Sequence, residues 1–267
     1  MNYDLAKLNS KVDEDIFVSS PKLFVLARST LSDDIDQLYA YFGSTPQIDN
    51  TGLPAERIIE IAGRTCYLSF RNPSGKTTAE YNQNLIRQKH DSVLEHTSWT
   101  FVLAGVSRAF THQLVRHRVG FSFSQLSQQY VDHQNTRFVI PAEIVKNAEL
   151  LDVWKKNVII QRKAYGELLR QSNDVSREFS SREQLRSIRS LARSILPNCT
   201  EAAVAVTANA RSWRHFLELR GSTEGDIEMR RVSAILLSTL QREAPSLFSD
   251  FVQMTLADGW PSVEKMS

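Results

Sequence analysis

The side chains best suited to hold an anionic ligand lie in one string, THQLVRHRVGFSFSQLSQQY, from Thr111 to Tyr130. Gln113, Arg116 and His117 follow one another at i, i+3 and i+4, so on a short helix they are expected to project from one side. The helical pattern then stops, and residues 120–127 place serines and a glutamine among phenylalanines. A helix that ends in cations and leads into a hydroxyl-rich loop can bind an anion through charge-assisted hydrogen bonds.

A structural explanation of the same string stays open. Arg116 and Arg118 could neutralise the dipole at the helix C-terminus while the serines cap a turn. Histidines also gather around this string: His90, His96, His112, His117 and His133. None of them has HExxH or Cys/His spacing, so we expect no metal site.

A second cluster is TANARSWRHFLELRG, Thr207 to Gly221. On a helix, Trp213, Phe216, Leu217 and Arg220 share one face. An arginine at the end of an aromatic stripe either finds a partner or reaches solvent one turn before a glycine cap. Arg211 and His215 lie on a neighbouring face, where they could contact a planar aromatic ligand or be solvated.

A third cluster is a basic stripe on the predicted helix that begins at Ser181. Its members follow at intervals of four, three and four: Arg182, Arg186, Arg189 and Arg193. Most stripes of this kind are solvated faces, and we expect that for the first three. Arg193 lies nearest the helix end and is expected to turn inward.

Composition limits the classes of protein to consider. The 267 residues carry a net charge of +2 and are 42% hydrophobic, which suits a packed globular chain and excludes disorder. There is no GxGxxG, Walker A or GxSxG motif, so a nucleotide or flavin site would be built from side chains. The N-terminal segment lacks the apolar core of a signal peptide, and we expect a cytoplasmic location.

Hydrophobic periodicity predicts an α+β protein with a dominant helical layer on a small sheet. The expected strands are 22–28, 98–106, 136–140 and 201–208, and the expected helices are 54–62, 77–90, 142–171, 181–195, 211–220 and 224–241. We predict an N-terminal arm (1–21), one catalytic domain (22–260) and a C-terminal tail (261–267).

Taken together, five ordered motifs resemble the flavin-dependent thymidylate synthases. They are SVLEH from Ser92, the Arg116-His117-Arg118 triplet, SQLSQ-Y from Ser124, LARSILPN from Leu191, and NARxxxHFxxLR from Asn209 to Arg220. The resemblance covers residues 22–255 and implies a mixed α/β homotetramer with FAD sites shared between subunits. It also implies reductive methylation of dUMP to dTMP, with 5,10-methylenetetrahydrofolate as the carbon donor and NADPH as the reductant of FAD.

The resemblance also implies residue roles. Arg220 is the expected catalytic residue, which binds the uracil ring and favours ionisation at N3. The residues expected to bind the nucleotide are Gln113, Leu114, Val115, Arg116, Gln125, Leu126, Ser127, Gln128, Gln129, Arg193 and Arg220. Those expected to bind FAD are Ser92, Arg116, His117, Arg118, Gln125, Asn209, Ala210, Arg211 and His215. The family needs no cysteine nucleophile, and Cys199 is expected to be a packed thiol.

Two features depart from the family pattern. Eight residues separate Arg118 from Ser127, one more than usual, with the insertion near Gly120. Gln129 stands where the family has an arginine that binds the nucleotide. Three alternatives therefore stay open: methylation of UMP in a specialised pathway, a catalytically inert relative that still binds flavin or nucleotide, and an RNA-contacting protein that uses the basic stripe.

Overall fold

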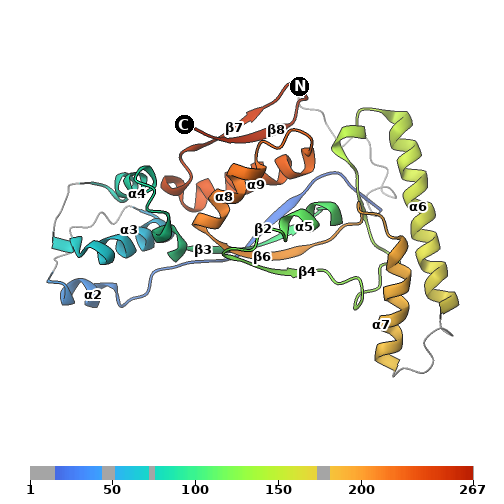
Figure 1. Cartoon of the computed structure of the whole chain (residues 1–267), viewed down its shortest axis with the longest axis horizontal. Coiled ribbons are helices and arrows are strands. Elements are labelled where there is room, and N and C mark those ends of the chain that lie inside the picture. Colours follow the sequence, from blue (N-terminus) through green and yellow to red (C-terminus); the bar gives the residue numbers. More distant parts are fainter. Residues whose placement is uncertain (1–15, 44–51, 72–75, 173–180, 267) are drawn as a thin grey trace. The chain divides into compact units, whose positions relative to one another are not determined.

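The computed structural model describes residues 16–43, 52–71, 76–172 and 181–266 (Figure 1). The chain divides into two compact units. The first unit comprises Met1–Lys22, Leu103–Arg116 and Ser124–Val204, and the second comprises Leu23–Val102, His117–Phe123 and Ala205–Ser267. No helix among the described residues is long and apolar enough to cross a membrane. The domain boundaries expected from the sequence remain predictions.

A four-stranded sheet has the order β2-β3-β6-β4. Its strands are β2 (Lys22–Arg28), β3 (Ser98–Ala104), β6 (Val204–Asn209) and β4 (Phe121–Gln125). Side chains of β3 and β6 alternate between buried and half-buried, as strands with one face on a core require. The strands expected near residues 22, 98 and 201 are confirmed, although the third begins at Val204.

In the second unit, α8 (Ala210–Arg220) and α9 (Ile227–Glu243) supply much of the core. Trp213, Phe216 and Leu217 on α8 are fully buried, so the predicted aromatic face is confirmed. Phe101 of β3 packs on Trp213 with ring centroids 5.4 Å apart. The antiparallel hairpin of β7 (Phe251–Thr255) and β8 (Pro261–Lys265) follows α9 and was not expected from the sequence.

Three further helices belong to the second unit: α2 (Ile35–Tyr41), α3 (Pro54–Tyr67) and α4 (Thr78–Arg87). The Thr77 hydroxyl accepts from the Glu80 backbone N–H, and the Glu80 carboxylate accepts from the Thr77 N–H, which starts α4. The expected helix 77–90 ends at Arg87, because Lys89 is in the left-handed region at φ 57°. A 3₁₀ turn, Asp91–His96, then leads into β3.

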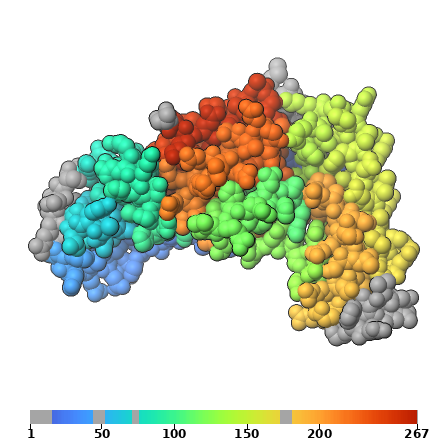
Figure 2. Space-filling view, viewed as in Figure 1, coloured from blue at the N-terminus to red at the C-terminus, as the bar shows by residue number. Residues whose placement is uncertain are grey.

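The first unit contains α5 (Arg108–Leu114), α6 (Ala148–Gln171) and α7 (Ser181–Ala192), together with the 3₁₀ turns Ala142–Ile144 and Arg193–Ile195. Helices α6 and α7 lie side by side (Figures 1 and 2). Strand β1 (Phe17–Val18) pairs in parallel with β5 (Phe138–Val139), which is shorter than the expected strand 136–140.

An apolar cluster holds the N-terminal strand of the first unit in place. Phe17, Phe138 and Val158 are buried together, and Cys199 packs against them. The expectation that Cys199 is a packed thiol is therefore confirmed.

Two predictions around the Arg116-His117-Arg118 triplet are wrong. Helix α5 ends at Leu114. Gln113 is therefore helical, but Arg116 and His117 lie beyond the helix and do not share its face. Residues Phe121–Gln125 form strand β4 and not a loop. The alternation of phenylalanine and serine in FSFSQ is the period-2 pattern of a strand, and the phenylalanines are the less exposed residues.

Candidate active site

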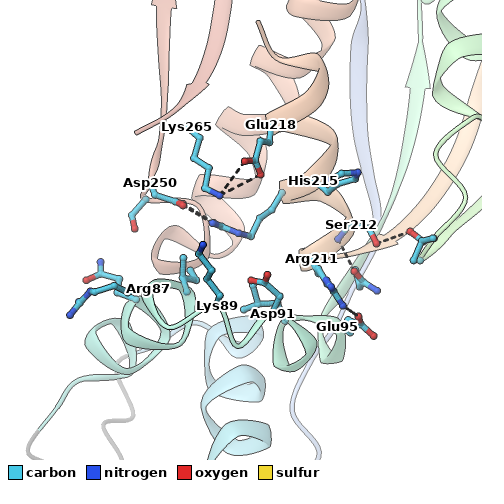
Figure 3. A pocket seen from close by; sticks show the side chains of 18 of the residues that line it. Arg87, Lys89, Asp91, Glu95, Arg211, Ser212, His215, Glu218, Asp250 and Lys265 are labelled. Carbon is cyan, nitrogen blue, oxygen red and sulfur yellow. Dashed lines mark hydrogen bonds and ion pairs between the residues drawn. The ribbon is translucent and has the colours of Figure 1, made fainter. Parts of the chain in front are cut away.

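The second unit contains a cavity of about 1220 Å³, lined by α8 from its N-terminal cap to Glu218, by the Asp91–His96 turn, by the end of α4 and by residues beside β7 and β8 (Figure 3). Its polar lining includes Arg87, Lys89, Glu95, Asn209, Arg211 and His215. The volume exceeds the roughly 300–1,000 Å³ of most small-molecule sites, which suits an elongated ligand. Asn209, Arg211 and His215, three of the residues expected to bind FAD, therefore line one cavity.

Helix α8 starts at this cavity with a local cap. The Asn209 side-chain oxygen accepts from the Ser212 backbone N–H at 2.8 Å. Ala210 is buried, and its backbone N–H donates to the Thr97 carbonyl. The positive end of the helix dipole thus faces a space that Arg211 and Lys89 also make cationic. Ser92 lies exposed in the Asp91–His96 turn. Asp91, Leu94 and Glu95 of the same turn line the cavity.

The turn after the triplet packs against the same helix end. Gly120 has φ +72°, and a Cβ there would lie 2.2 Å from the Ser212 oxygen and 2.8 Å from the Asn209 amide nitrogen. The Ser212 hydroxyl donates to the Val119 carbonyl at 2.9 Å. Both the left-handed backbone and the close approach require glycine at this position. The one-residue departure near Gly120 is therefore a tight turn against the cap of α8.

Arg220, at the other end of α8, is half-buried and has a partner. Its Nε donates to Nε2 of His117 at 3.1 Å. The His117 ring lies among Phe121, Phe216 and His215, with centroid distances of 6.0, 5.1 and 6.4 Å. Of the two alternatives for this arginine, the structure therefore supports the one in which it finds a partner.

Burial lowers the pKa of His117 from its usual value, and the charges of Arg220 and His215 lower it further. An imidazole that accepts at Nε2 is neutral and carries its proton on Nδ1. Arg116 and Arg118, which flank the triplet's histidine, are exposed.

The first unit contains most residues expected to bind the nucleotide. Gln125 donates from Nε2 to the Thr111 hydroxyl at 2.7 Å, which fixes the end of β4 on α5. The Ser127 hydroxyl accepts from the backbone N–H of Gln129 and of Tyr130, so residues 127–130 form a compact turn. Leu114 is buried, so the side chain of this residue serves the core.

Arg108 is a candidate that sequence reasoning missed. Burial lowers the pKa of its guanidinium, and the charge of Arg193 lowers it further. The two arginines thus repel one another in a partly buried place, an arrangement that an anion would stabilise. The sequence contained a signal for this candidate. Arg108 follows the N-cap residue Ser107 and so lies at a helix N-terminus, where cations are disfavoured.

The basic stripe of α7 is only partly a solvated face. Arg186 and Arg189 are half-buried, and both contact the turn at residues 127–130. The expectation of a solvated face is therefore wrong for these two arginines.

Comparisons with known proteins identify the family of the chain. The family model described as thymidylate synthase complementing protein matches residues 48–246. A flavin-dependent thymidylate synthase from Mycobacteroides abscessus is 42% identical over 217 residues, which is 79% of this chain and 84% of that protein. The enzyme of the same name from Mycobacterium tuberculosis gives the same identity and coverage.

The fold is also similar to a crystal structure of PolB, a UMP/dUMP methylase from Streptomyces cacaoi bound with 5-Br UMP. The TM-score is 0.61 at 18% identity, and the match covers 87% of this chain and 94% of that one. A likeness at this identity concerns the fold, and the predicted mixed α+β class is confirmed.

The chain belongs to the flavin-dependent thymidylate synthase family. This confirms the resemblance carried by the five motifs, and with it the expected enzyme class and flavin cofactor. The individual site residues and the homotetramer remain predictions.

Proposed function

We propose that the protein methylates dUMP at C5 to give dTMP, with 5,10-methylenetetrahydrofolate as the carbon donor and with FAD and NADPH as reductants. The observation that carries this proposal is the contact between Arg220 and the neutral imidazole of His117, beside His215 at the cavity. It joins the Arg116-His117-Arg118 triplet to the end of α8. The likeness to enzymes named flavin-dependent thymidylate synthase supports the same reaction.

Arg220 is proposed as the catalytic residue. Its Nε is held by His117, which leaves the terminal nitrogens of the guanidinium to bind the uracil ring. A fixed cation beside N3 stabilises the ionised ring and raises electron density at C5, which attacks the one-carbon unit. Because His117 is neutral, it accepts from the Arg220 guanidinium and does not repel it.

The nucleotide is proposed to bind through Arg220 and through the other residues to which the family resemblance gives this role. They are Gln113, Leu114, Val115, Arg116, Gln125, Leu126, Ser127, Gln128, Gln129 and Arg193. Arg108 is added to this set, because its guanidinium faces the charge of Arg193 and both would be stabilised by a phosphate. Leu114 would contribute through its backbone, since its side chain is buried.

FAD is proposed to bind through Ser92, Arg116, His117, Arg118, Gln125, Asn209, Ala210, Arg211 and His215. The cavity fits such a ligand in volume, and Arg87, Lys89 and Arg211 are among the charged residues that line it. Arg211 forms an ion pair with Glu95 at 2.6 Å, and both side chains are about half exposed. An exposed pair contributes little to stability, so Arg211 can exchange this carboxylate for a diphosphate at small cost. When bound, the flavin supplies the hydride that converts the transferred methylene to a methyl group.

The proposal is tested by tritium release from 5-labelled dUMP. In this reaction C5 gains the methylene carbon and loses its hydrogen as a proton, while NADPH supplies the two electrons. Release is expected only with NADPH and methylenetetrahydrofolate both present. A yellow protein with a flavin spectrum and no release would instead identify an inert relative, and a colourless protein would remove the proposal.

Steady-state comparison of dUMP with UMP tests the substrate. Gln129 replaces a cation near the proposed nucleotide site, which makes this comparison necessary. We expect dUMP to have the higher kcat/KM. A higher value for UMP would assign the enzyme to ribonucleotide methylation.

We also propose that the enzyme is a homotetramer, with FAD sites shared between subunits. Leu150, Val153 and Ile160 along α6 are each more than half exposed, which is unfavourable for an isolated chain. Light scattering should give four times the chain mass of 30.4 kDa. We further propose a cytoplasmic location, because Cys66 is a free, exposed thiol, which suits a reducing compartment.

A further inference from the structure

The compact turn Ser127–Tyr130, which follows β4, is held from α7 by three side chains. Gln129 donates from its amide nitrogen to the Ser190 hydroxyl at 2.8 Å. Its amide oxygen accepts from Nε of Arg186 at 3.4 Å. Both polar ends of the Gln129 side chain are therefore engaged by α7.

Tyr130 of the turn also contacts α7, through Arg189 and Arg186. Arg189 donates to the Tyr130 carbonyl oxygen at 2.8 Å. The Arg186 guanidinium also lies over the Tyr130 ring, 5.7 Å from its centroid, within cation–π range. The turn thus meets two arginines one helical turn apart, through its backbone, its aromatic ring and its amide.

We propose that Gln129, Arg186 and Arg189 form a clamp that sets the position of the Ser127–Tyr130 turn, and that all three are positioning residues for nucleotide binding. The inference rests on the proposed function only for the identity of the ligand. Gln129 acts through its side chain, which bonds to Ser190 and Arg186 of α7. Two of the four arginines in the stripe, Arg186 and Arg189, thus contact the turn.

The clamp explains why a neutral residue occupies position 129. Arg186 has Glu183 as a carboxylate partner at 3.4 Å, and a second guanidinium at 129 would approach Arg186 where the Gln129 amide oxygen now accepts. Like charges at that separation repel, and the acceptor would be lost as well. The substitution Gln129→Arg is therefore expected to disorder the turn, although it adds a cation near an anionic ligand.

The direction in which Gln129→Arg changes the Kd for dUMP distinguishes a positioning role of Gln129 from direct contact with the nucleotide. If Gln129 positions the turn, Gln129→Arg raises the Kd for dUMP by roughly five- to tenfold, about the worth of one hydrogen bond. If Gln129 instead faced the nucleotide phosphate, the added charge would lower the Kd. Titration of the full-length holoenzyme with dUMP, without methylenetetrahydrofolate, measures the change, and a lowered Kd would overturn the proposal.

Hydrogen exchange gives a readout that does not depend on turnover. The amides of Gln129 and Tyr130 donate to the Ser127 hydroxyl, and their protection reports the order of the turn. Ser190→Ala and Arg189→Ala should each increase exchange across residues 127–130 several-fold in the nucleotide-free protein. Arg189→Lys, which keeps a donor for the Tyr130 carbonyl, should restore most of the protection.

Arg182→Ala is the matched control, because Arg182 belongs to the same stripe but lies exposed at the start of α7. It should change neither exchange nor dUMP binding. Unchanged exchange in both Ser190→Ala and Arg189→Ala would refute the clamp, even in an active enzyme. The wild type could release no tritium while Ser190→Ala and Arg189→Ala still increased hydrogen exchange across residues 127–130. That result would refute the proposed function and leave the clamp supported.

Discussion

The Nε of Arg220 donates to Nε2 of His117 at 3.1 Å, which joins two side chains 103 residues apart in the sequence. The bond fixes the tautomer of the histidine and the rotation of the guanidinium at once. It also makes the site sensitive to protonation, since an imidazolium at 117 could not accept this bond and would repel Arg220.

The stability of the protein should therefore fall in mildly acidic solution. Burial, Arg220 and His215 lower the folded-state pKa of His117 below 6.5, and burial lowers that of His133 as well. Between each lowered pKa and 6.5 the unfolded chain binds more protons, so the free energy of unfolding rises with pH. Urea unfolding at pH values from 5 to 8 should show the loss as pH falls below 6.5.

A variant without the titrating ring at 117 isolates the contribution of His117. His117→Gln keeps an acceptor for Arg220 but cannot be protonated, so the pH dependence of stability should become shallower while that from His133 remains. An unchanged slope would show that His117 is not the group responsible.

Arg220→Ala should abolish methylation and retain flavin. We expect kcat to fall at least about 100-fold, the usual cost of removing a group that stabilises developing charge. The flavin absorbance per chain should stay near that of the wild type, because the cavity is lined by other residues of α8. Near-normal turnover in this variant would refute the assigned role.

Gly120→Ala should destabilise the protein and weaken flavin binding. The substitution forces a Cβ to 2.2 Å from the Ser212 oxygen at a φ of +72°. Strain of this kind costs on the order of 1–3 kcal/mol. Gly225→Ala is the matched control, since a Cβ at Gly225 has no neighbouring atom within 4 Å. Thermal unfolding and flavin titration of the two variants should differ clearly, and equal results would argue against the close approach.

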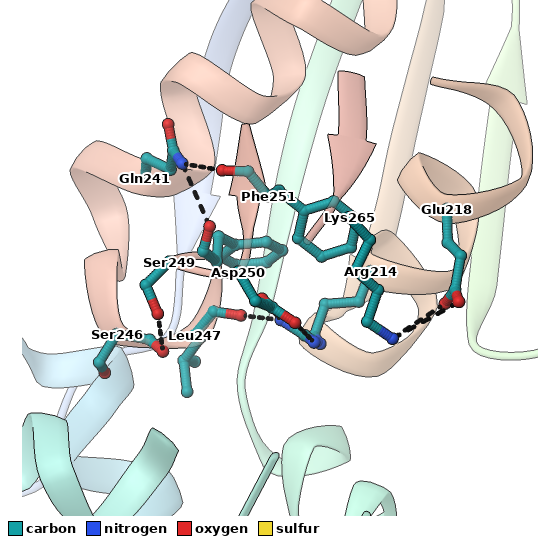
Figure 4. A network of polar contacts seen from close by, with 10 residues as sticks. Arg214, Glu218, Gln241, Ser246, Leu247, Ser249, Asp250, Phe251 and Lys265 are labelled. Atoms are coloured by element: carbon teal, nitrogen blue, oxygen red, sulfur yellow. Dashed lines mark hydrogen bonds and ion pairs between the residues drawn. The ribbon is translucent and has the colours of Figure 1, made fainter. Parts of the chain in front are cut away.

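Asp250→Asn should cost far more stability than Glu218→Ala, although both residues pair with a cation on the same side of the cavity (Figures 3 and 4). Arg214 is 8% exposed and donates to the Asp250 carboxylate at 2.6 Å and to the Leu247 carbonyl. Removing the negative charge that pairs with such a buried cation lowers the free energy of unfolding by up to about 3–5 kcal/mol.

The comparison pair is Lys265 with Glu218, at 3.4 Å between exposed side chains. Pairs of that kind contribute about 0–1 kcal/mol. Chemical denaturation of both variants measures the difference, and similar losses would mean that the Arg214 pair is less buried in solution.

Much of the second unit could be predicted because its residues follow simple periods. The aromatic face of α8 and the alternation in β3 are each buried against one core, so hydrophobic residues recur at the period of a helix or of a strand. Strand β4 carried the same kind of signal in FSFSQ, but the serines invited a loop interpretation. The β7–β8 hairpin was missed because its strands are mostly exposed and their pattern is weak.

The partners of the site residues could not be predicted in the same way. The contacts between Arg220 and His117, and between Gln129 and Ser190, join segments far apart in the chain, and no local period encodes them. The role suggested for Arg108 also depends on a distant arginine. The motifs therefore indicated which residues matter, while the fold determined what each one touches.

Helix α8 acts as a rigid spacer. Its eleven residues span roughly 16 Å, with the Asn209 cap at one end and Arg220 at the other. Three fully buried side chains along one face prevent it from rotating or sliding. One inserted residue would turn everything beyond it by about 100° and carry the guanidinium away from His117. The length of this helix, more than any single contact, thus sets the separation between the Asn209 cap and the Arg220–His117 pair.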